Sequence, residues 1–323
     1  MSLDGRTDVA GQTLHDLTSP SLGFASAGIS PDGLLVAYAP PSLTIVDLTS
    51  QRADIVMQRT VPDRIVWSAD SSQLALDLGL GDMAVAGARD GSLHAVAGTP
   101  PNAVGDLIGW IDSSHLAVTY IGGQTIVSNP NNSQDQYATS IAVASLSTET
   151  GQTHVIATIH SPGLGQWSFS LAPDGRTILF SNRQYRSYPY TPQVDEIDVA
   201  SGTVTPLPHI DQITQSGFTA VAWQRGTGLL AVSSGFIVNG DLKDWILNPG
   251  QDSAVALPNV GYVASWAPAG STVVVTTGQQ TENGTGPFTL TALSIGPSGQ
   301  VVSSTVLTNA AMTFPFLGFI RTG

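Results

Sequence analysis

The chain has 323 residues, of which 11% are charged, and its formal net charge is −13 because 24 Asp and Glu outnumber 11 Lys and Arg. This excess of acid argues against sequence-independent binding of nucleic acid and against attraction to anionic membranes, since both depend on clustered Lys and Arg. The sequence contains no cysteine, which excludes disulfides, zinc ribbons, iron–sulfur sites and thiol catalysis.

The N-terminal segment begins Met1-Ser-Leu-Asp-Gly-Arg6 and has no apolar stretch of the kind found in signal peptides. No run of 18 apolar residues follows, so we expect no membrane-spanning helix and no direct insertion into a membrane. Gln12–Leu17 is predicted to form an outermost strand, and residues 7–11 are a candidate second strand beside it.

A short phrase recurs seven times between residue 29 and the end of the chain. A small apolar run leads to one bulky anchor residue, and Gly or Ser usually follows within four residues. The anchors are Ile29, Trp67, Trp110, Leu171, Trp223, Trp266 and Phe319. Their spacing of roughly 40 to 60 residues suits a four-stranded blade, with or without a loop insertion.

Each repeated unit is predicted to contain four short strands. In the first unit these are Phe24–Ile29, Leu34–Ala39, Leu43–Leu48 and Ala53–Gln58. Asp-Gly at positions 32–33 supplies the positive-φ turn of a hairpin, and the same pair recurs at 174–175. No stretch shows sustained helical periodicity with caps, so the fold class is predicted to be all-β.

The residue before each anchor is mostly small, as at Gly28, Gly109 and Ala222. We expect this because the innermost strands of neighbouring blades approach one another closely. The anchor tryptophans are therefore interpreted as side chains that fill the space between blades rather than as platforms for a ligand.

Ser30-Pro-Asp-Gly33 and Ala172-Pro-Asp-Gly175, each after an apolar strand, resemble the WD40-like propeller repeats of the TolB type. The resemblance extends over nearly the whole chain. It implies one β-propeller domain spanning residues 1–323 and an extracytoplasmic location, periplasmic or secreted. The Gly-His and Trp-Asp dipeptides of true WD40 repeats are absent, so the scaffold role of that family does not follow.

Seven anchors predict seven four-stranded antiparallel blades. The last unit stops at Gly323 directly after its innermost strand. We therefore expect the last blade to be shared between strands from the two ends of the chain. A six-bladed ring with an accessory strand is the alternative.

The loops that join second to third strands are long in units three to six. These loops are Ile121–Gln136, Ser181–Gln193, Ser234–Asp241 and Gly278–Pro287. They are predicted to raise a rim over half of one propeller face, where long loops on a rigid scaffold commonly bind ligands.

The second of these loops is rich in Tyr and Arg, which supply stiff apolar area with polar tips and are favoured at binding sites. Paired Arg side chains also suit a carboxylate or a sugar acid. One tryptophan near the third long loop stands outside the anchor position. The candidate ligand-binding residues are Arg183, Tyr185, Arg186, Tyr188, Tyr190 and Trp245.

No motif for a serine nucleophile, a zinc protease or a phosphate-binding loop occurs, and the six His form no metal-ligand pattern. We predict no catalytic residue and no cofactor, with Ca²⁺ as the one metal considered. Its candidate oxygen ligands are Asp135, Asp241 and Asp244. Asp195, Glu196 and Asp198 are interpreted as a solvated strand edge.

The sequence favours a non-catalytic binding module that presents the Tyr/Arg rim to a protein or peptide, or to a carbohydrate, and not to nucleic acid. One alternative is a propeller hydrolase or lyase with a metal or carboxylates at the central channel. Acids converging from at least three blades at one mouth of the channel would favour that enzyme. Another alternative is an extracytoplasmic sensor domain of a membrane-anchored protein.

Overall fold

The protein is all-β in the computed structural model. The residues that it describes are 8–9, 12–13, 27–39, 42–50, 52–57, 61–79, 81–96, 106–128, 134–160, 166–183, 194–207, 218–224, 227–234, 243–248, 253–257, 262–267, 271–278 and 288–308. Every regular element in these ranges is a strand, so they include no helix that could cross a membrane.

Strands β3 to β26 form six four-stranded antiparallel sheets, in each of which the strands pair in chain order. The first sheet comprises β3 (Ala27–Ile29), β4 (Leu35–Tyr38), β5 (Leu43–Asp47) and β6 (Arg52–Met57). The second comprises β7 (Arg64–Trp67), β8 (Gln73–Asp77), β9 (Met83–Gly87) and β10 (Leu93–Ala95). The third comprises β11 (Leu107–Trp110), β12 (His115–Ser128), β13 (Gln134–Ser147) and β14 (Thr153–His160).

The remaining three sheets repeat the same meander. The fourth comprises β15 (Gln166–Leu171), β16 (Thr177–Arg183), β17 (Val194–Asp198) and β18 (Val204–Pro206). The fifth comprises β19 (Phe218–Trp223), β20 (Leu230–Ser234), β21 (Lys243–Asn248) and β22 (Ser253–Ala256). The sixth comprises β23 (Tyr262–Trp266), β24 (Thr272–Gly278), β25 (Phe288–Ile295) and β26 (Val301–Thr308).

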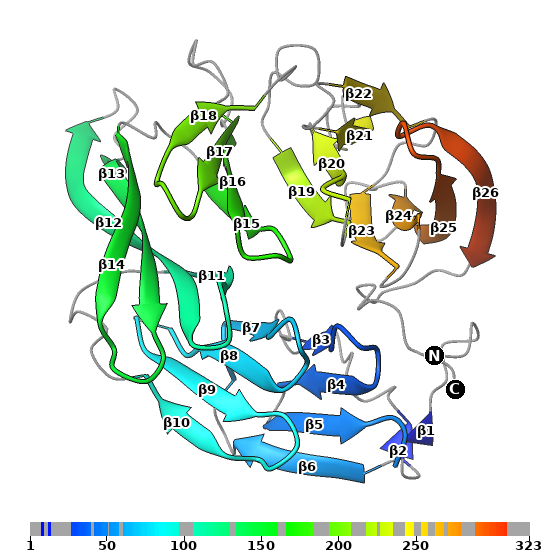
Figure 1. Ribbon diagram of the computed structural model, residues 1–323, viewed down its shortest axis with the longest axis horizontal. Helices are drawn as coiled ribbons and strands as arrows, with labels where there is room; N and C mark the ends of the chain where they lie inside the picture. Colours follow the sequence, from blue (N-terminus) through cyan, green and yellow to red (C-terminus); the bar gives the residue numbers. More distant parts are fainter. Residues whose placement is uncertain are drawn as a thin grey trace.

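The six sheets follow one another around a common centre, with the first strand of each sheet innermost (Figure 1). Each innermost strand from β3 to β19 contacts the innermost strand of the next sheet. This arrangement is a β-propeller, and the sheets are its blades. The repeated phrase of the sequence therefore marks the innermost strands, as the spacing predicted.

Each anchor residue from Ile29 to Trp266 is the last residue of an innermost strand. The anchor tryptophans reach back to the preceding sheet and donate a hydrogen bond there from the indole nitrogen. The acceptors are Gly28 O for Trp67 (3.2 Å), Val66 O for Trp110 (3.0 Å), Ser170 Oγ for Trp223 (2.9 Å) and Ala222 O for Trp266 (2.9 Å). Each acceptor belongs to the residue just before an anchor, which explains why that residue is small.

Gly109 shows how close this approach is. A Cβ atom at this position would lie 3.2 Å from Cδ2 of Leu171, the anchor that takes the place of a tryptophan in the fourth sheet. The anchors therefore pack between blades, as predicted, and the small residue before each anchor accommodates the next one.

Five hydrophobic clusters fill the five interfaces between consecutive sheets. Successive side chains of a strand point to opposite faces of its sheet. Leu74 and Leu76 of β8 accordingly pack with the first sheet, whereas Ala75 between them packs with the third. The middle strands are thus buried on both faces, which is why most of their residues are apolar.

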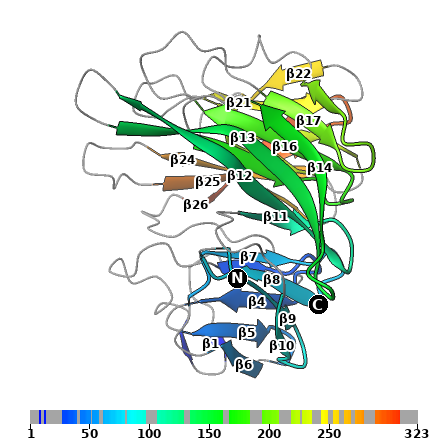
Figure 2. The same cartoon turned by 90° about the vertical axis from the view of Figure 1, so that its left-hand side faces the viewer.

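The meander places the first-to-second and third-to-fourth connections of each sheet at one end, which we name the turn face. The second-to-third connections lie at the opposite end, which we name the loop face. Strands β12 and β13 have 14 residues each and reach past the end of β11 at the loop face (Figure 2). The expected loop Ile121–Gln136 is therefore wrong in part, because its flanks pair as strands up to Ser128 and from Gln134 onward.

Aspartates close the tight turns of the turn face. Oδ1 of Asp70 accepts hydrogen bonds from Ser68 Oγ (2.6 Å) and Ser72 N (3.0 Å), and Asp90 accepts one from Ser92 N (3.0 Å). The turn aspartates whose pKa lies below the ordinary value are Asp32, Asp47, Asp70, Asp90, Asp112 and Asp198. The predicted Asp-Gly turns are confirmed, since Gly33 and Gly175 both have a φ of 73°.

A seventh blade is not confirmed by the described residues. Strands β1 (Asp8–Val9) and β2 (Gln12–Thr13) pair antiparallel as a separate two-stranded sheet, within the two N-terminal segments expected to form strands. Both views draw this sheet next to the first blade (Figures 1 and 2). The seventh anchor phrase, Phe319–Gly323, lies outside the described residues.

Candidate functional site

Most of the predicted Tyr/Arg rim lies outside the described residues. That part comprises Tyr185, Arg186, Tyr188 and Tyr190, together with the metal candidate Asp241. Arg183 is the last residue of β16, and Val194 begins β17, so both ends of the rim segment lie at the loop face. Asp135 is in β13, opposite Val127 of β12.

Trp245 and Asp244 are neighbours in β21 but face opposite ways. Trp245 is half-buried against the cluster between the fourth and fifth sheets, and its buried indole nitrogen has no hydrogen-bond partner among the described residues. Asp244 is 1% exposed, and its Oδ1 accepts a hydrogen bond of 2.7 Å from Ser233 Oγ. Trp245 therefore contributes to the packing between blades, and its contact with a ligand stays a prediction.

Of the three candidate metal ligands, Asp241 and the side chain of Asp135 lie outside what the structure describes, so the predicted site stays a prediction. Over the described ranges, no group of three or more His, Cys, Asp or Glu side chains is placed to hold a metal ion. The carboxylate of Asp244 is already engaged by Ser233 inside its sheet.

The interpretation of Asp195 and Glu196 as a solvated edge is wrong. Asp195 is 6% exposed, and Glu196 is half-buried in the middle of β17. Burial raises the pKa of Glu196 above its ordinary value. Asp198 is exposed as expected and closes the turn after β17 by accepting a hydrogen bond from Ser201 N (2.7 Å). Strand alternation had placed Asp195 and Glu196 on opposite faces, but both of those faces are covered by neighbouring blades.

A polar group gathers at the loop face between the second and third sheets. We name it the mouth cluster, and its members are Asp63, Arg64, Asp77 and Asp106. Arg64 begins β7 and lies opposite Asp77, the last residue of β8. Asp106 stands directly before β11 of the next sheet and hydrogen-bonds through its backbone N–H to Thr119 Oγ1 (3.0 Å).

Asp77 joins the two sheets through its carboxylate. Oδ1 accepts a hydrogen bond from Gly79 N (2.9 Å), and Oδ2 accepts one from Leu107 N of the third sheet (3.4 Å). Asp77 is 7% exposed, and its pKa is raised because it is buried and because Asp106 and Asp63 add negative charge nearby. The two backbone amides oppose this shift without reversing it.

Arg64 is the cation of the mouth cluster. Its side chain is exposed to solvent, yet enough protein surrounds it that burial lowers its pKa, against the opposing attraction of Asp106 and Asp77. Tyr120 of β12 packs into the same interface, and within the described part of the chain its buried hydroxyl has no hydrogen-bond partner. The carboxylates and the guanidinium of the mouth cluster together can hydrogen-bond a polar or charged ligand from several directions.

The mouth cluster could not be recognised in the sequence because up to four strands separate its members along the chain. One signal was present: Asp77 ends the apolar run Leu74-Ala-Leu76, where an acid has to be buried or paired. Counting across the hairpin from that position would have placed Arg64 opposite it.

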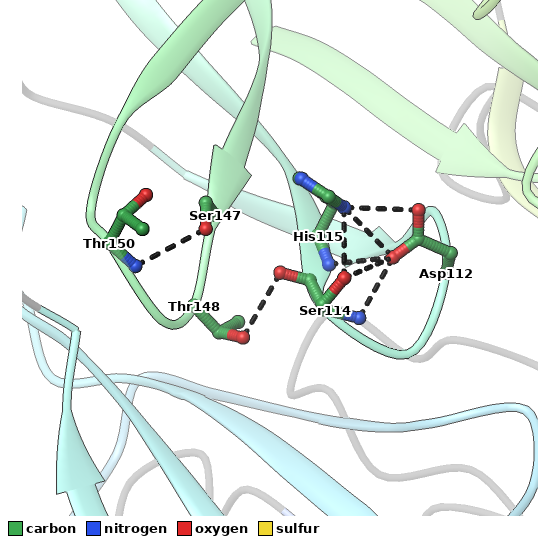
Figure 3. A network of polar contacts seen from close by, with 6 residues as sticks. All are labelled: Asp112, Ser114, His115, Ser147, Thr148 and Thr150. Carbon is green, nitrogen blue, oxygen red and sulfur yellow. Dashed lines mark hydrogen bonds and ion pairs between the residues drawn. The ribbon is translucent and has the colours of Figure 1, made fainter.

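Asp112, Ser114 and His115 have the composition of a catalytic triad but not its geometry (Figure 3). Both carboxylate oxygens of Asp112 lie 3.0 Å from Nδ1 of His115, and Ser114 Oγ lies 3.1 Å from the same nitrogen. A triad requires the serine and the aspartate on different ring nitrogens.

The role of these residues is to close a turn. Oδ1 of Asp112 accepts hydrogen bonds from the backbone N–H groups of Ser114 (2.8 Å) and His115 (2.9 Å). Thr148 Oγ1 donates to Ser114 O (3.0 Å) and thereby ties the two turns of the third sheet together, as Figure 3 shows. The group therefore stabilises the turn face.

No model of a known protein family and no curated protein matches the sequence. Solved structures do match over most of the chain. A structure entitled oligogalacturonate lyase in complex with manganese has a TM-score of 0.62 at 15% identity and covers 86% of this chain and 77% of that one. An oligogalacturonate lyase from Vibrio parahaemolyticus has a TM-score of 0.61 at 14% identity, over 91% of this chain and 80% of its own.

A chain of the mitotic checkpoint complex is also similar, with a TM-score of 0.57 at 17% identity over 86% of this chain and 76% of that one. Identities this low support the β-propeller fold alone. They do not confirm the TolB-type family. Because the similar structures include both a lyase and a member of a protein assembly, they do not choose between an enzyme and a binding protein.

Proposed function

We propose that this chain is a non-catalytic binding module whose loop face receives a protein or peptide segment, with a carbohydrate as the second ligand class. The observation that carries the proposal is the β12–β13 hairpin, which extends beyond its blade at the loop face, next to the mouth cluster. A projecting hairpin beside a group of polar and charged side chains is an arrangement typical of recognition surfaces. The carboxylates of the mouth cluster come from two sheets, short of the three that would favour the enzyme.

The proposed binding surface also includes the Tyr/Arg segment 184–190. The strands that flank it, β16 and β17, end at the loop face, one blade along from the projecting hairpin. Tyr185, Tyr188 and Tyr190 would then supply aromatic contact area beside the charged mouth cluster. An extracytoplasmic location is also proposed, on the TolB-type resemblance alone, and is tested by immunodetection in periplasmic and secreted fractions.

We further propose seven blades, the last built from both ends of the chain. Val36 and Val46 of the first sheet are 6% and 3% exposed although they alternate with the residues that face the second sheet. Val274 of the sixth sheet is 0% exposed and likewise alternates with residues that face the fifth. One more blade between the first and sixth sheets would cover all three side chains.

The binding proposal is tested by thermal-shift measurements against a peptide library and against oligosaccharides, including oligogalacturonates. A ligand that binds the folded state raises the melting temperature. Arg64→Gln, and separately the triple change of Tyr185, Tyr188 and Tyr190 to Ala, should abolish the shift. The matched control Arg176→Gln, at an exposed arginine of the turn face, should keep it. The triple Tyr variant should melt at nearly the same temperature as the unmodified protein without ligand.

Two results would overturn the proposal. The first is a ligand-induced shift that both loop-face variants keep and Arg176→Gln loses. The second is cleavage of the bound oligosaccharide, seen as a change in its chain length, which would make the protein an enzyme.

A further inference from the structure

The outermost strand of the sixth sheet, β26, is exposed from Val302 to Val306, whereas Val301 at its start packs against the cluster between the fifth and sixth sheets. Its partner is β25, and no strand in the described part of the chain pairs with its outer edge. All five residues from Val302 to Val306 are exposed, with Val302 at 67% and Val306 at 55%. Because successive side chains point to opposite faces, both faces of the strand are open as well as its edge.

Other outermost strands lack this combination. β10 and β18 are exposed along their whole length, but each has three residues and offers a short edge. β14 has eight residues, as β26 does, but buries Ala157 and Ile159 against the fourth sheet. Short or partly covered edges are a known protection against strand pairing, and β26 has neither.

The chemistry of β26 also favours pairing. Its sequence, Val301-Val-Ser-Ser-Thr-Val-Leu-Thr308, contains no charge and no proline, which are two of the guards of an edge strand. A third guard, the β-bulge, is present near both ends of the strand, where the register with β25 skips Val302 and Leu307, and Ser303, Ser304 and Thr305 pair regularly between the two bulges. The protein as a whole carries a net charge of −13, so the repulsion between two copies is weakest where they meet through an uncharged surface.

We infer that β26 pairs with β26 of a second copy of this chain, antiparallel across a two-fold axis at Ser304. Residue Val302 then lies opposite Val306 of the second copy, and Ser304 lies opposite its own equivalent. The exposed valines stand two residues before and two residues after Ser304 in the sequence, so this register brings both of them to the contact, and β-branched cross-strand pairs are favourable. A two-fold contact of one patch with itself is the commonest way in which chains dimerise.

This dimer is independent of the proposed ligand-binding function, since β26 lies at the outer rim of the propeller and not in the loop face (Figure 1). Pairing along about five residues buries less than the roughly 1,200 Å² of a standard stable interface. We therefore expect a weak dimer whose population rises with protein concentration.

A single introduced thiol tests the register. The chain contains no cysteine, so Ser304→Cys creates the one thiol of the protein. Directly opposed residues of an antiparallel pair have Cα atoms about 4.5–5.5 Å apart, within the span of a disulfide. Under mild oxidation Ser304→Cys should form a disulfide-linked dimer severalfold faster than Ser303→Cys, which in this register does not face its own equivalent, and than Val155→Cys at an exposed position of β14.

A second measurement does not depend on cross-linking. The double change of Val302 and Val306 to Lys places four like charges across the two-fold pair, so it should abolish the dimer in sedimentation equilibrium while leaving the melting temperature unchanged. Equal cross-linking rates for the three cysteine variants, or a monomer at all concentrations with no effect of the lysines, would overturn the inference. Pairing of β26 with another protein in place of a second copy would overturn it too, because Ser304→Cys would then fail to cross-link to itself.

Discussion

Ser71 takes the left-handed backbone conformation that the repeated turn elsewhere assigns to glycine. Its φ is 64°, close to the 73° of Gly33 and Gly175, and it is the one described non-glycine residue with a positive φ. A residue with a side chain is destabilised in this backbone conformation, and the strain persists where other contacts hold the residue in place. Here the Ser71 hydroxyl accepts a hydrogen bond of 3.0 Å from Asp32 N in the neighbouring blade. The strained residue thus joins the first blade to the second.

Ser71 variants should separate the strain from the hydrogen bond. Ser71→Ala keeps the strain and loses the hydroxyl, so it should lower the free energy of unfolding by about 1–2 kcal/mol. Ser71→Gly loses the same hydrogen bond but relieves the strain, so its loss should be smaller. Urea unfolding of the three proteins gives the comparison, and an alanine variant as stable as the unmodified protein would contradict this account.

Glu196, in contrast to the Ser71 hydrogen bond, lowers the stability of the folded protein at neutral pH. Burial raises its pKa in the folded state above the ordinary 4.5, so ionising it costs more in the folded chain than in the unfolded one. Below the unfolded pKa both states hold the proton and no cost arises. The cost appears as the pH rises through the interval between the two pKa values and persists at neutral pH.

The variant Glu196→Gln should therefore be more stable than the unmodified protein at pH 7 and equally stable near about pH 3. Melting temperatures across this pH range test the expectation. Glu149→Gln, at an exposed acid of a turn, is the control and should give no such pH-dependent gain. A Glu196→Gln variant that is less stable at pH 7 would mean that the carboxylate has a stabilising partner.

At the scale of the element, the strands were predictable where the repeat was regular. In the first unit the predicted strand Leu34–Ala39 corresponds to β4 (Leu35–Tyr38), and the predicted strand Leu43–Leu48 corresponds to β5 (Leu43–Asp47). Alternation of small apolar residues and Asp-Gly turns carries this information locally. The hairpin β12–β13 was not predicted beyond Tyr120, because Gly122-Gly123 reads as a loop. Its outer half forms by continuing a register that the inner half has already set.

The candidate site was less predictable than the strands for the same reason. Arg64, Asp77 and Asp106 meet through pairing within one hairpin and packing between two blades, neither of which leaves a local pattern. The Tyr/Arg segment stood out because all of its residues are close in sequence. Local composition therefore identified the Tyr/Arg segment as a candidate site. The mouth cluster can be recognised only in the tertiary structure.

The turns should make the protein sensitive to acid. The pKa of Asp70 is lowered chiefly by the Ser68 hydroxyl and then by the backbone and hydroxyl groups of Ser72. A carboxylate whose folded pKa is depressed stabilises the fold above its unfolded pKa, and this contribution is lost as the pH falls through the folded value. Because several blades share such turns, stability should drop steeply below about pH 4.

Asp70→Asn should remove the part of this pH dependence of stability that Asp70 contributes. The variant should be less stable than the unmodified protein at pH 7, and the difference should shrink as the pH falls toward about 2. Chemical denaturation at a series of pH values gives both quantities. A difference that stays constant over the range would show that ionisation of Asp70 is not what stabilises the turn.

At the scale of the whole molecule, the closure of the ring decides how the first and last blades are protected. Val36, Val46 and Val274 are buried on faces that no described sheet covers. If strands from both chain ends form the closing blade, removal of one end should expose these side chains together. Each re-exposed valine costs about 1.5–3 kcal/mol.

Deletion of residues 1–17 should therefore lower the free energy of unfolding by several kcal/mol and reduce cooperativity, as measured by denaturant unfolding. The shorter deletion of residues 1–7 ends before β1 and serves as the control, which should leave stability nearly unchanged. Equal stability of the two deletion variants would argue against a blade shared between the chain ends.

In each of the four described indole hydrogen bonds between blades, the anchor tryptophan donates to the blade that precedes its own in the chain. As the protein emerges from the ribosome, each new blade thus meets a docking surface that has already been synthesised. We expect the propeller to assemble progressively from its N-terminal side during translation, with a single unfinished blade face open to solvent at any stage. Only one step requires the whole chain to have been synthesised, namely the packing of the last blade against the first.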